Sequence, residues 1–101
     1  MKRFTTPTHE FTMPIEADEI IRFLLTYKQN GNIVLEKTEE DMSRSGKAWS
    51  ITLTQQESGK FAAGNATAEV SYLTRSGRRD TSDPLVFYVE DVSNEKVLVW
   101  T

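Results

Sequence analysis

Alternating apolar and polar residues are the main structural signal along this chain. From Ile20 to Lys28, every second side chain falls on one face, with Ile21, Phe23, Leu25 and Tyr27 on one side and Arg22 and Thr26 opposite. This alternation is typical of a half-buried strand. A helix is the competing interpretation, because several of these residues also suit a 3.6-residue period. Asn30-Gly31 favours the strand, since both residues tolerate the positive φ of a type I′ hairpin turn. The partner strand then runs over Ile33, Val34 and Leu35.

The same two-residue period predicts further strands. A short extended stretch is predicted from Phe11 to Met13, closed by Pro14. Apolar residues alternate in three further strands: Trp49, Ile51 and Leu53; Ala66, Ala68, Val70 and Tyr72; and Leu85, Phe87 and Val89. Pro84 is acceptable at the start of the last strand, because an opening position need not donate a ladder hydrogen bond. The connections are predicted to be an acidic polar loop from Thr38 to Lys47, turning at Gly46, and a second turn at Ser76-Gly77-Arg78.

One short helical turn interrupts the strands. Thr54-Gln55-Gln56-Glu57 fits a capping box, in which the Thr hydroxyl and the Glu carboxylate each satisfy an exposed backbone amide. Only about one turn fits before Gly59, and Phe61 is expected to plug the core behind it. The elements together predict an all-β protein: an antiparallel β-sandwich of about six to eight strands with one helical turn. Residues 1–101 form a single domain, with residues 1–8 and 97–101 expected to be flexible ends.

Composition narrows the class of protein. A chain of 101 residues has surface enough for a single core. The formal charge of -3 disfavours coating nucleic acid, which requires an excess of basic residues. There is no cysteine for a disulfide or thiolate site. No apolar run has the length of a signal peptide or a membrane span. We therefore expect a product made in the cytosol that stays soluble unless it joins something larger.

No constellation of residues predicts catalysis, a metal or a cofactor. The single histidine, His9, lacks a nucleophile and an orienting acid, and is expected to be structural, bonding a strand end. The acidic run Glu36, Glu39, Glu40 and Asp41 is expected to be solvated. Calcium binding by Asp80, Asp83 and Asp91 would lack the residue order of an EF-hand loop. We expect no enzyme.

Two features are candidate partner contacts. Arg75, Arg78 and Arg79 surround a predicted turn and could grip an acidic partner or a phosphate, although such clusters are more often solvated and Asp80 and Asp83 dilute their field. Trp49 alternates with apolar residues and is expected in the core. Trp100 is harder to bury in the same core, and could anchor a partner.

The order of short motifs along the chain resembles a known group of proteins. The motifs are Met1-Lys2-Arg3, Thr5-Thr6-Pro7-Thr8-His9 and Phe11, then Thr26 to Gly31, Leu35-Glu36-Lys37, Leu53 to Glu57, Phe61, and finally Val89, Val92 and Glu95-Lys96-Val97. This order resembles that of small uncharacterised proteins encoded in phages and prophages of Gram-positive gut bacteria. The layout is also similar to N-terminal sandwich domains of phage baseplate proteins. The resemblance implies an all-β fold and a place among virion or virion-assembly genes, and it supplies no catalytic residues.

The leading hypothesis is a non-enzymatic phage structural or assembly module that acts through protein–protein contacts. Its partners would be other phage structural proteins or a second copy of itself, with neither nucleic acid nor a membrane involved, and it would end in the virion. Edge strands, the segment Met1 to Thr8 and the tail Val97 to Thr101 are the expected docking elements. The alternative is a carbohydrate-binding or adhesin-like sandwich that uses Trp100, Tyr72 or Tyr88 as a stacking platform.

Overall fold

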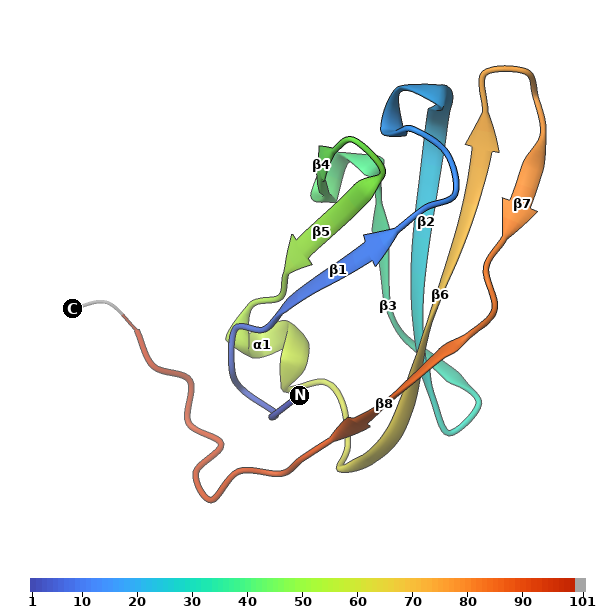
Figure 1. Ribbon diagram of the computed structural model, residues 1–101. Coiled ribbons are helices and arrows are strands. Elements are labelled where there is room, and N and C mark those ends of the chain that lie inside the picture. Colours follow the sequence, from blue (N-terminus) through green and yellow to red (C-terminus); the bar gives the residue numbers. More distant parts are fainter. Residues whose placement is uncertain (100–101) are drawn as a thin grey trace.

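Two antiparallel sheets pack against each other in the computed structural model, which describes residues 1–99 (Figure 1). The smaller sheet has the order β1-β5-β4, with bounds Thr8–Thr12, Ala48–Thr52 and Ser43–Ser45. The larger sheet has the order β3-β2-β6-β7, with bounds Asn32–Thr38, Ile20–Gln29, Gly64–Thr74 and Arg79–Thr81; β8 (Leu85–Val89) also pairs with β6. The helical elements are α1 (Gln55–Ser58) and two 3-10 turns, η1 (Ala17–Glu19) and η2 (Glu39–Asp41). The predicted antiparallel β-sandwich is confirmed.

The hairpin of β2 and β3 forms at the predicted turn. Gln29 pairs with Asn32 across a two-residue loop, and the loop residues Asn30 and Gly31 have φ angles of 54° and 78°. Both angles are positive, as a type I′ turn requires. The turn therefore fixes the pairing of Gln29 and Lys28, and a register shift between Tyr27 and Lys28 sets the pairing of the rest of the hairpin.

The inward rows predicted from alternation make the core. Trp49 is fully buried and stacks on Phe23 of the other sheet, with ring centroids 4.2 Å apart. Two residues of these rows do not reach the core: Ile21 is exposed, with Ile20 buried instead, and Leu85 at the start of β8 is exposed as well. The pairing of β2 with β6 shifts register between Ile20 and Arg22, and such a shift reverses which side chains face the core. The remaining core residues are Phe11, Met13, Ala17, Leu25, Tyr27, Leu35, Ile51, Leu53, Phe61, Ala66, Ala68, Val70, Tyr72 and Val89.

Two short strands were not predicted. The segment Thr38 to Lys47, expected to be a loop, contains η2 and β4, and β7 follows the turn at Gly77. Each strand is three residues long, and every residue in it is exposed. Their sequences, Ser-Arg-Ser and Arg-Asp-Thr, have no apolar alternation. They are held in place by pairing with β5 and β6, so no local pattern marks them.

The helical turn α1 forms with the predicted capping box. The Thr54 hydroxyl accepts from the Glu57 amide at 3.1 Å, and the Glu57 carboxylate accepts from the Thr54 amide at 2.9 Å. Glu57 also forms an ion pair with Lys37 of β3. Phe61 is buried behind the turn, as expected. The local sequence thus both starts the helix and delivers Phe61 to the core.

Two strands, β7 and β8, pair with the same edge of the long strand β6. Residues Ser71 to Leu73 pair with β7, whereas Gly64 to Ala68 pair with β8. The chain passes from one partner to the other near Pro84, which has no N–H to donate. As a result β8 runs along the end of β6 nearest α1, with its other edge turned toward β1 (Figure 1).

The two ends of the described chain contact each other. Residues 1–8, expected to be a flexible end, are hydrogen-bonded to the body: Arg3 N–H donates to Glu90 C=O at 3.0 Å, and Ser58 Oγ donates to Thr5 C=O at 2.7 Å. Residues 90–99 contain no strand, apart from a single bridge at Glu90. Trp100 and Thr101 lie outside the described residues.

Replacing Gly31 tests the hairpin turn. An added Cβ would meet no atom within 4 Å, so the cost of Gly31→Ala comes from the positive φ alone. We expect a loss of about 1–2 kcal/mol in the free energy of unfolding, measured by denaturant titration. Asn30→Gly is the matched control and should change stability by less than about 0.5 kcal/mol. An unchanged stability of Gly31→Ala would contradict the turn type.

Candidate functional site

A groove of about 470 Å³ lies between β1 and β8, where the edge of one sheet faces the edge of the other. Phe11, Ala68, Leu85 and Phe87 give it an apolar lining. The rest of the lining is Met1, Pro7, Thr8, His9 and Glu10. The groove thus collects residues from both ends of the sequence.

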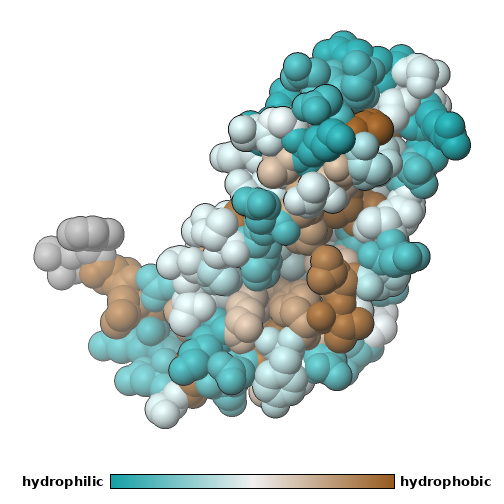
Figure 2. Space-filling model, viewed as in Figure 1, coloured by the Kyte–Doolittle hydropathy of each residue, from teal (hydrophilic) through white to brown (hydrophobic). Residues whose placement is uncertain are grey.

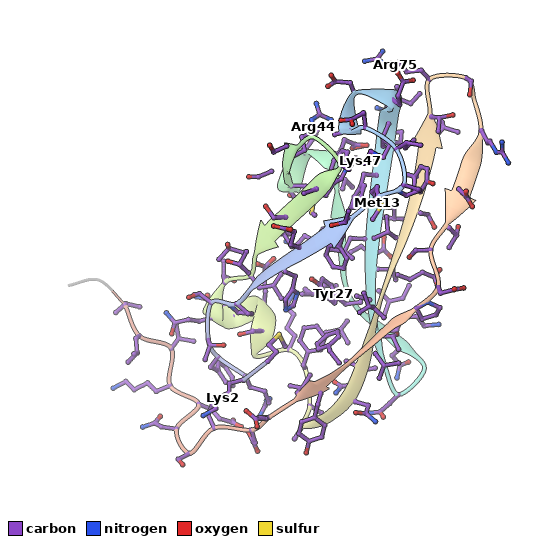
Figure 3. The ribbon with its side chains drawn as sticks, viewed as in Figure 1. Lys2, Met13, Tyr27, Arg44, Lys47 and Arg75 are labelled. Atoms are coloured by element: carbon purple, nitrogen blue, oxygen red, sulfur yellow. The ribbon has the colours of Figure 1, made fainter. Side chains whose placement is uncertain are left out.

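His9 and Phe87 of the groove lining belong to a cluster of rings that continues into the core. His9 Nδ1 and the Tyr27 hydroxyl are hydrogen-bonded at 2.5 Å, and Figure 3 shows Tyr27 in the region between β1 and β8. The Phe87 ring lies 5.6 Å from the His9 ring and 6.0 Å from the Tyr27 ring, measured between centroids. Phe61 packs edge-on against Tyr27 at 5.6 Å. His9 is therefore structural, as predicted, but its partner is a side chain of the opposite sheet.

Burial changes the pKa values of this pair. Desolvation lowers the pKa of His9, and the positive amine of Met1 lowers it further. Desolvation also raises the pKa of Tyr27, with a smaller contribution from the charge of Glu57. Both groups are thus held neutral near pH 7, which suits a hydrogen bond in an apolar surrounding.

The β1 side of the groove has an unpaired strand edge. Leu53 N–H donates to Pro7 C=O and Met13 N–H donates to Lys47 C=O, so the odd-numbered residues of this segment point toward β5. Backbone groups of successive strand residues point to opposite sides. Thr8, Glu10 and Thr12 of β1 therefore direct their N–H and C=O groups away from β5, along the edge that borders the groove.

The β8 side has an unpaired edge as well. Glu90 N–H donates to Met1 C=O at 2.7 Å, and Tyr88 C=O accepts from the Met1 amine at 3.0 Å, so the even-numbered residues point away from β6. Only the end of this edge is covered, by Met1 to Arg3. Following the same alternation, the N–H and C=O of Val86 and the N–H of Tyr88 point outward, and no strand within residues 1–99 pairs with them.

Apolar side chains on β8 add to this open edge. Val86 is 64% exposed, Tyr88 is 59% exposed, and Leu85 beside them is also exposed. Figure 2 shows the corresponding apolar surface over β8, surrounded by hydrophilic side chains. A strand edge with both open backbone groups and exposed apolar side chains is a ready surface for pairing with another chain.

The predicted arginine contacts lie away from this groove. Arg75 is committed to the fold: its Nε donates to Asp18 C=O at 2.6 Å, and its backbone N–H donates to Glu19 C=O at 2.9 Å. Arg78 is exposed in the turn. Arg79 lines a separate shallow hollow of about 240 Å³ on the outer face of the larger sheet. The structure therefore does not bring the three arginines together as one site.

The hollow beside Arg79 contains an arginine that the sequence analysis missed. Leu73 of β6 pairs with Arg22 on one side and with Arg79 on the other, which places both guanidinium groups on one face. No local signal marks this pair, because Arg22 and Arg79 meet only through the strand order β2-β6-β7. Trp100, the fourth predicted contact, lies outside the described residues.

Arg3 and Gln55 hold the segment after β8. The Arg3 guanidinium donates to Asp91 at 2.8 Å, to Glu95 at 2.6 Å and to the backbone C=O groups of Phe61 and Gly59. The hydrogen bond from Arg3 lowers the pKa of the Asp91 carboxyl. Gln55 exchanges two hydrogen bonds with the Leu98 backbone, each 2.8 Å long. Neither residue was singled out from sequence.

The described residues also bear on the predicted metal, sugar and membrane contacts. Within residues 1–99, no three His, Asp or Glu side chains gather closely enough to hold a metal ion, so Asp80, Asp83 and Asp91 do not form a calcium site there. Tyr72 is buried and makes no stacking platform for a sugar, whereas Tyr88 is exposed. None of the helices in the described part of the chain has the length and hydropathy needed to cross a membrane.

No family model matches this chain, and comparisons with curated proteins and with solved structures found no match either.

His9 makes stability depend on pH. Its pKa is lowered in the folded state, so below about pH 6.5 the unfolded chain binds a proton that the folded chain resists. Stability from this group is thus present above that pH and is lost as the pH falls. We expect wild type to lose more stability than His9→Gln between about pH 7.5 and about pH 5.5, in parallel denaturant titrations. Equal losses in both proteins would contradict the buried neutral histidine.

Proposed function

We propose that this chain is a non-enzymatic protein–protein interaction module that docks an extended segment of another chain in the β1–β8 groove. The single observation that carries the proposal is the pairing of features there: two strand edges without partners border one apolar groove. An added strand would satisfy the outward N–H and C=O groups of Val86 and the outward N–H of Tyr88 on β8, or the corresponding groups of Glu10 on β1.

The chemistry of the groove specifies the kind of segment that it takes. Main-chain hydrogen bonds supply affinity for any extended backbone, while the apolar lining selects apolar side chains at alternate positions. Burial of Leu85, Val86 and Tyr88 adds a hydrophobic contribution, at about 25 cal/mol for each Å² of apolar surface removed from water. A partner with a short extended apolar segment is therefore favoured over a folded convex surface.

The biological setting that we propose is phage structure or virion assembly. It is supported by the resemblance in motif order from Met1 to Val97, and a strand-docking module suits that setting because virions are built from repeated contacts between subunits. The partners would be other phage structural proteins or a second copy of this chain.

Carbohydrate binding is the second candidate, and exposed Tyr88 is the observation that favours it. At 59% exposure, its ring offers an apolar face to a sugar on the surface of β8. A glycan array distinguishes the two functions, because absence of binding at millimolar sugar removes the second candidate.

Val86→Pro tests the docking edge. The Val86 N–H points away from β6, so proline removes a donor from the open edge without removing a ladder hydrogen bond inside the sheet. We expect wild type to associate with itself or with the product of a neighbouring gene in light scattering, and the variant to associate at least about tenfold more weakly.

Val86→Thr is the matched control, because it keeps the backbone N–H and a β-branched side chain. It should retain more of the association than Val86→Pro. Wild type that stays monomeric at high concentration, both alone and with the neighbouring gene products, would rule out the proposed function.

A further inference from the structure

We infer that the occupant of the groove is residues 95–99 of a second copy of this chain, added as a strand beside β8. The inference rests on the proposed function, because it names the partner of the same groove. It follows from the properties of this segment, hereafter called the tail, and from the contacts that keep the tail away from the groove of its own copy.

The tail has apolar side chains of the kind found in buried strands, but these side chains are exposed to solvent. Leu98 is 75% exposed and Val99 is 72% exposed, and Val97 beside them is only half-buried. Figure 2 shows this apolar surface standing out from the body of the molecule. Three consecutive apolar residues, two of them β-branched, are typical of a strand covered on both faces. The tail therefore lacks a partner that its sequence suits.

Gln55 already holds the tail as a neighbouring strand would. Its side-chain amide donates to Leu98 C=O and accepts from Leu98 N–H, both at 2.8 Å. Backbone groups alternate in direction along an extended segment. Paired as a strand with Leu98 still turned toward Gln55, the tail would direct the N–H and C=O groups of Val97 and Val99 toward a second chain. The contacts with Gln55 are thus compatible with strand pairing on the other side of the tail.

The tail is held away from the groove of its own copy. Arg3 binds both Asp91 and Glu95, and Met1 to Arg3 occupy the edge beside Glu90 along which the chain would have to fold back. Figure 1 shows the tail leaving the body on the side of α1, away from the opening between β1 and β8. A second copy is free of these restraints.

Length and charge also match. β1 and β8 are five residues long, and five extended residues of the tail span a similar length of about 16 Å. Glu10 is the acidic side chain of the groove lining, and His9 beside it is held neutral. Lys96 is the exposed basic residue of the tail and suits Glu10, while Glu95 of the tail is already paired with Arg3 of its own copy.

Each copy carries one tail and one groove. Two copies can therefore exchange tails in a closed dimer, or successive copies can join head to tail in longer chains. Either arrangement uses the same contact.

The test is complementation between two full-length variants. In the tail variant, Leu98→Glu and Val99→Glu place charges on the proposed donor strand; in the groove variant, Val86→Pro blocks the acceptor edge. We expect wild type to self-associate in light scattering and each variant alone to do so at least about tenfold more weakly. Mixed together they should form a complex, because one supplies an intact groove and the other an intact tail.

Ile33→Glu is the matched control. It makes the same kind of change at an apolar side chain that is 56% exposed on β3, the opposite edge of the larger sheet. It should associate like wild type. Thermal denaturation checks that each variant is folded, and Val86→Glu replaces Val86→Pro if the proline variant is not.

The outcomes separate this inference from the proposed function. A tail variant that self-associates like wild type, or a mixture that forms no complex, overturns the tail as donor. Wild type that is monomeric alone, but binds a neighbouring gene product in a way that Val86→Pro abolishes, also overturns it while leaving the proposed function supported. Association of wild type and of the mixture, with loss in each single variant, supports it.

Discussion

The buried hydroxyl of Tyr27 needs a hydrogen-bond partner. The contact between the two sheets beside the groove depends on the residue that supplies this partner. Tyr27 belongs to β2 of the larger sheet, and its hydroxyl meets His9 of the smaller sheet. An unsatisfied buried hydroxyl costs about 1–3 kcal/mol, so this bond fixes β1 over the end of β2. Phe61 and Phe87 then pack around the Tyr27 ring, which brings α1 and β8 to the same point.

That arrangement leaves one side of the sandwich open. On this side the rings of His9, Tyr27 and Phe87 fill the space between the sheets, while the backbones of β1 and β8 do not pair with each other. Side chains therefore keep water out of the interior, and the backbone edges of β1 and β8 remain exposed to solvent. Exposed edges are usually protected by charges or prolines, and here the edge of β8 carries Val86 and Tyr88 instead. This departure from the usual protection is the reason that we propose binding at the groove.

Local features of the fold were predictable because each depends on residues close together in the sequence. Asn30-Gly31 needs only its own φ angles, and Thr54 with Glu57 needs only one helical turn. The inward rows around Trp49 and Val70 follow from the pleat of a single strand. The bulge beside Ile20 was missed because it comes from pairing with β6, which alternation within one strand does not record.

Most of the candidate site could not be predicted from the sequence. The groove exists because β1 pairs with β5 while β8 pairs with β6, and both pairings join residues far apart along the chain. For the same reason it was not predicted that Arg22 and Arg79 line one hollow, or that Arg75 donates a hydrogen bond to the backbone of Asp18. Val97 to Thr101 was expected to be a docking arm, but the anchor of Leu98 at Gln55 and the role of Arg3 required the folded structure.

The bonds between residues 1–3 and residues 88–95 close almost the whole length of the described chain into a loop. Contacts of such large sequence separation form slowly, because the entropy of closing the loop must be lost before they contribute. We therefore expect the anchor that points the tail outward to be completed late in folding. Assembly that depends on this anchor would wait for folding to finish, so incomplete chains would be excluded from it without any separate factor.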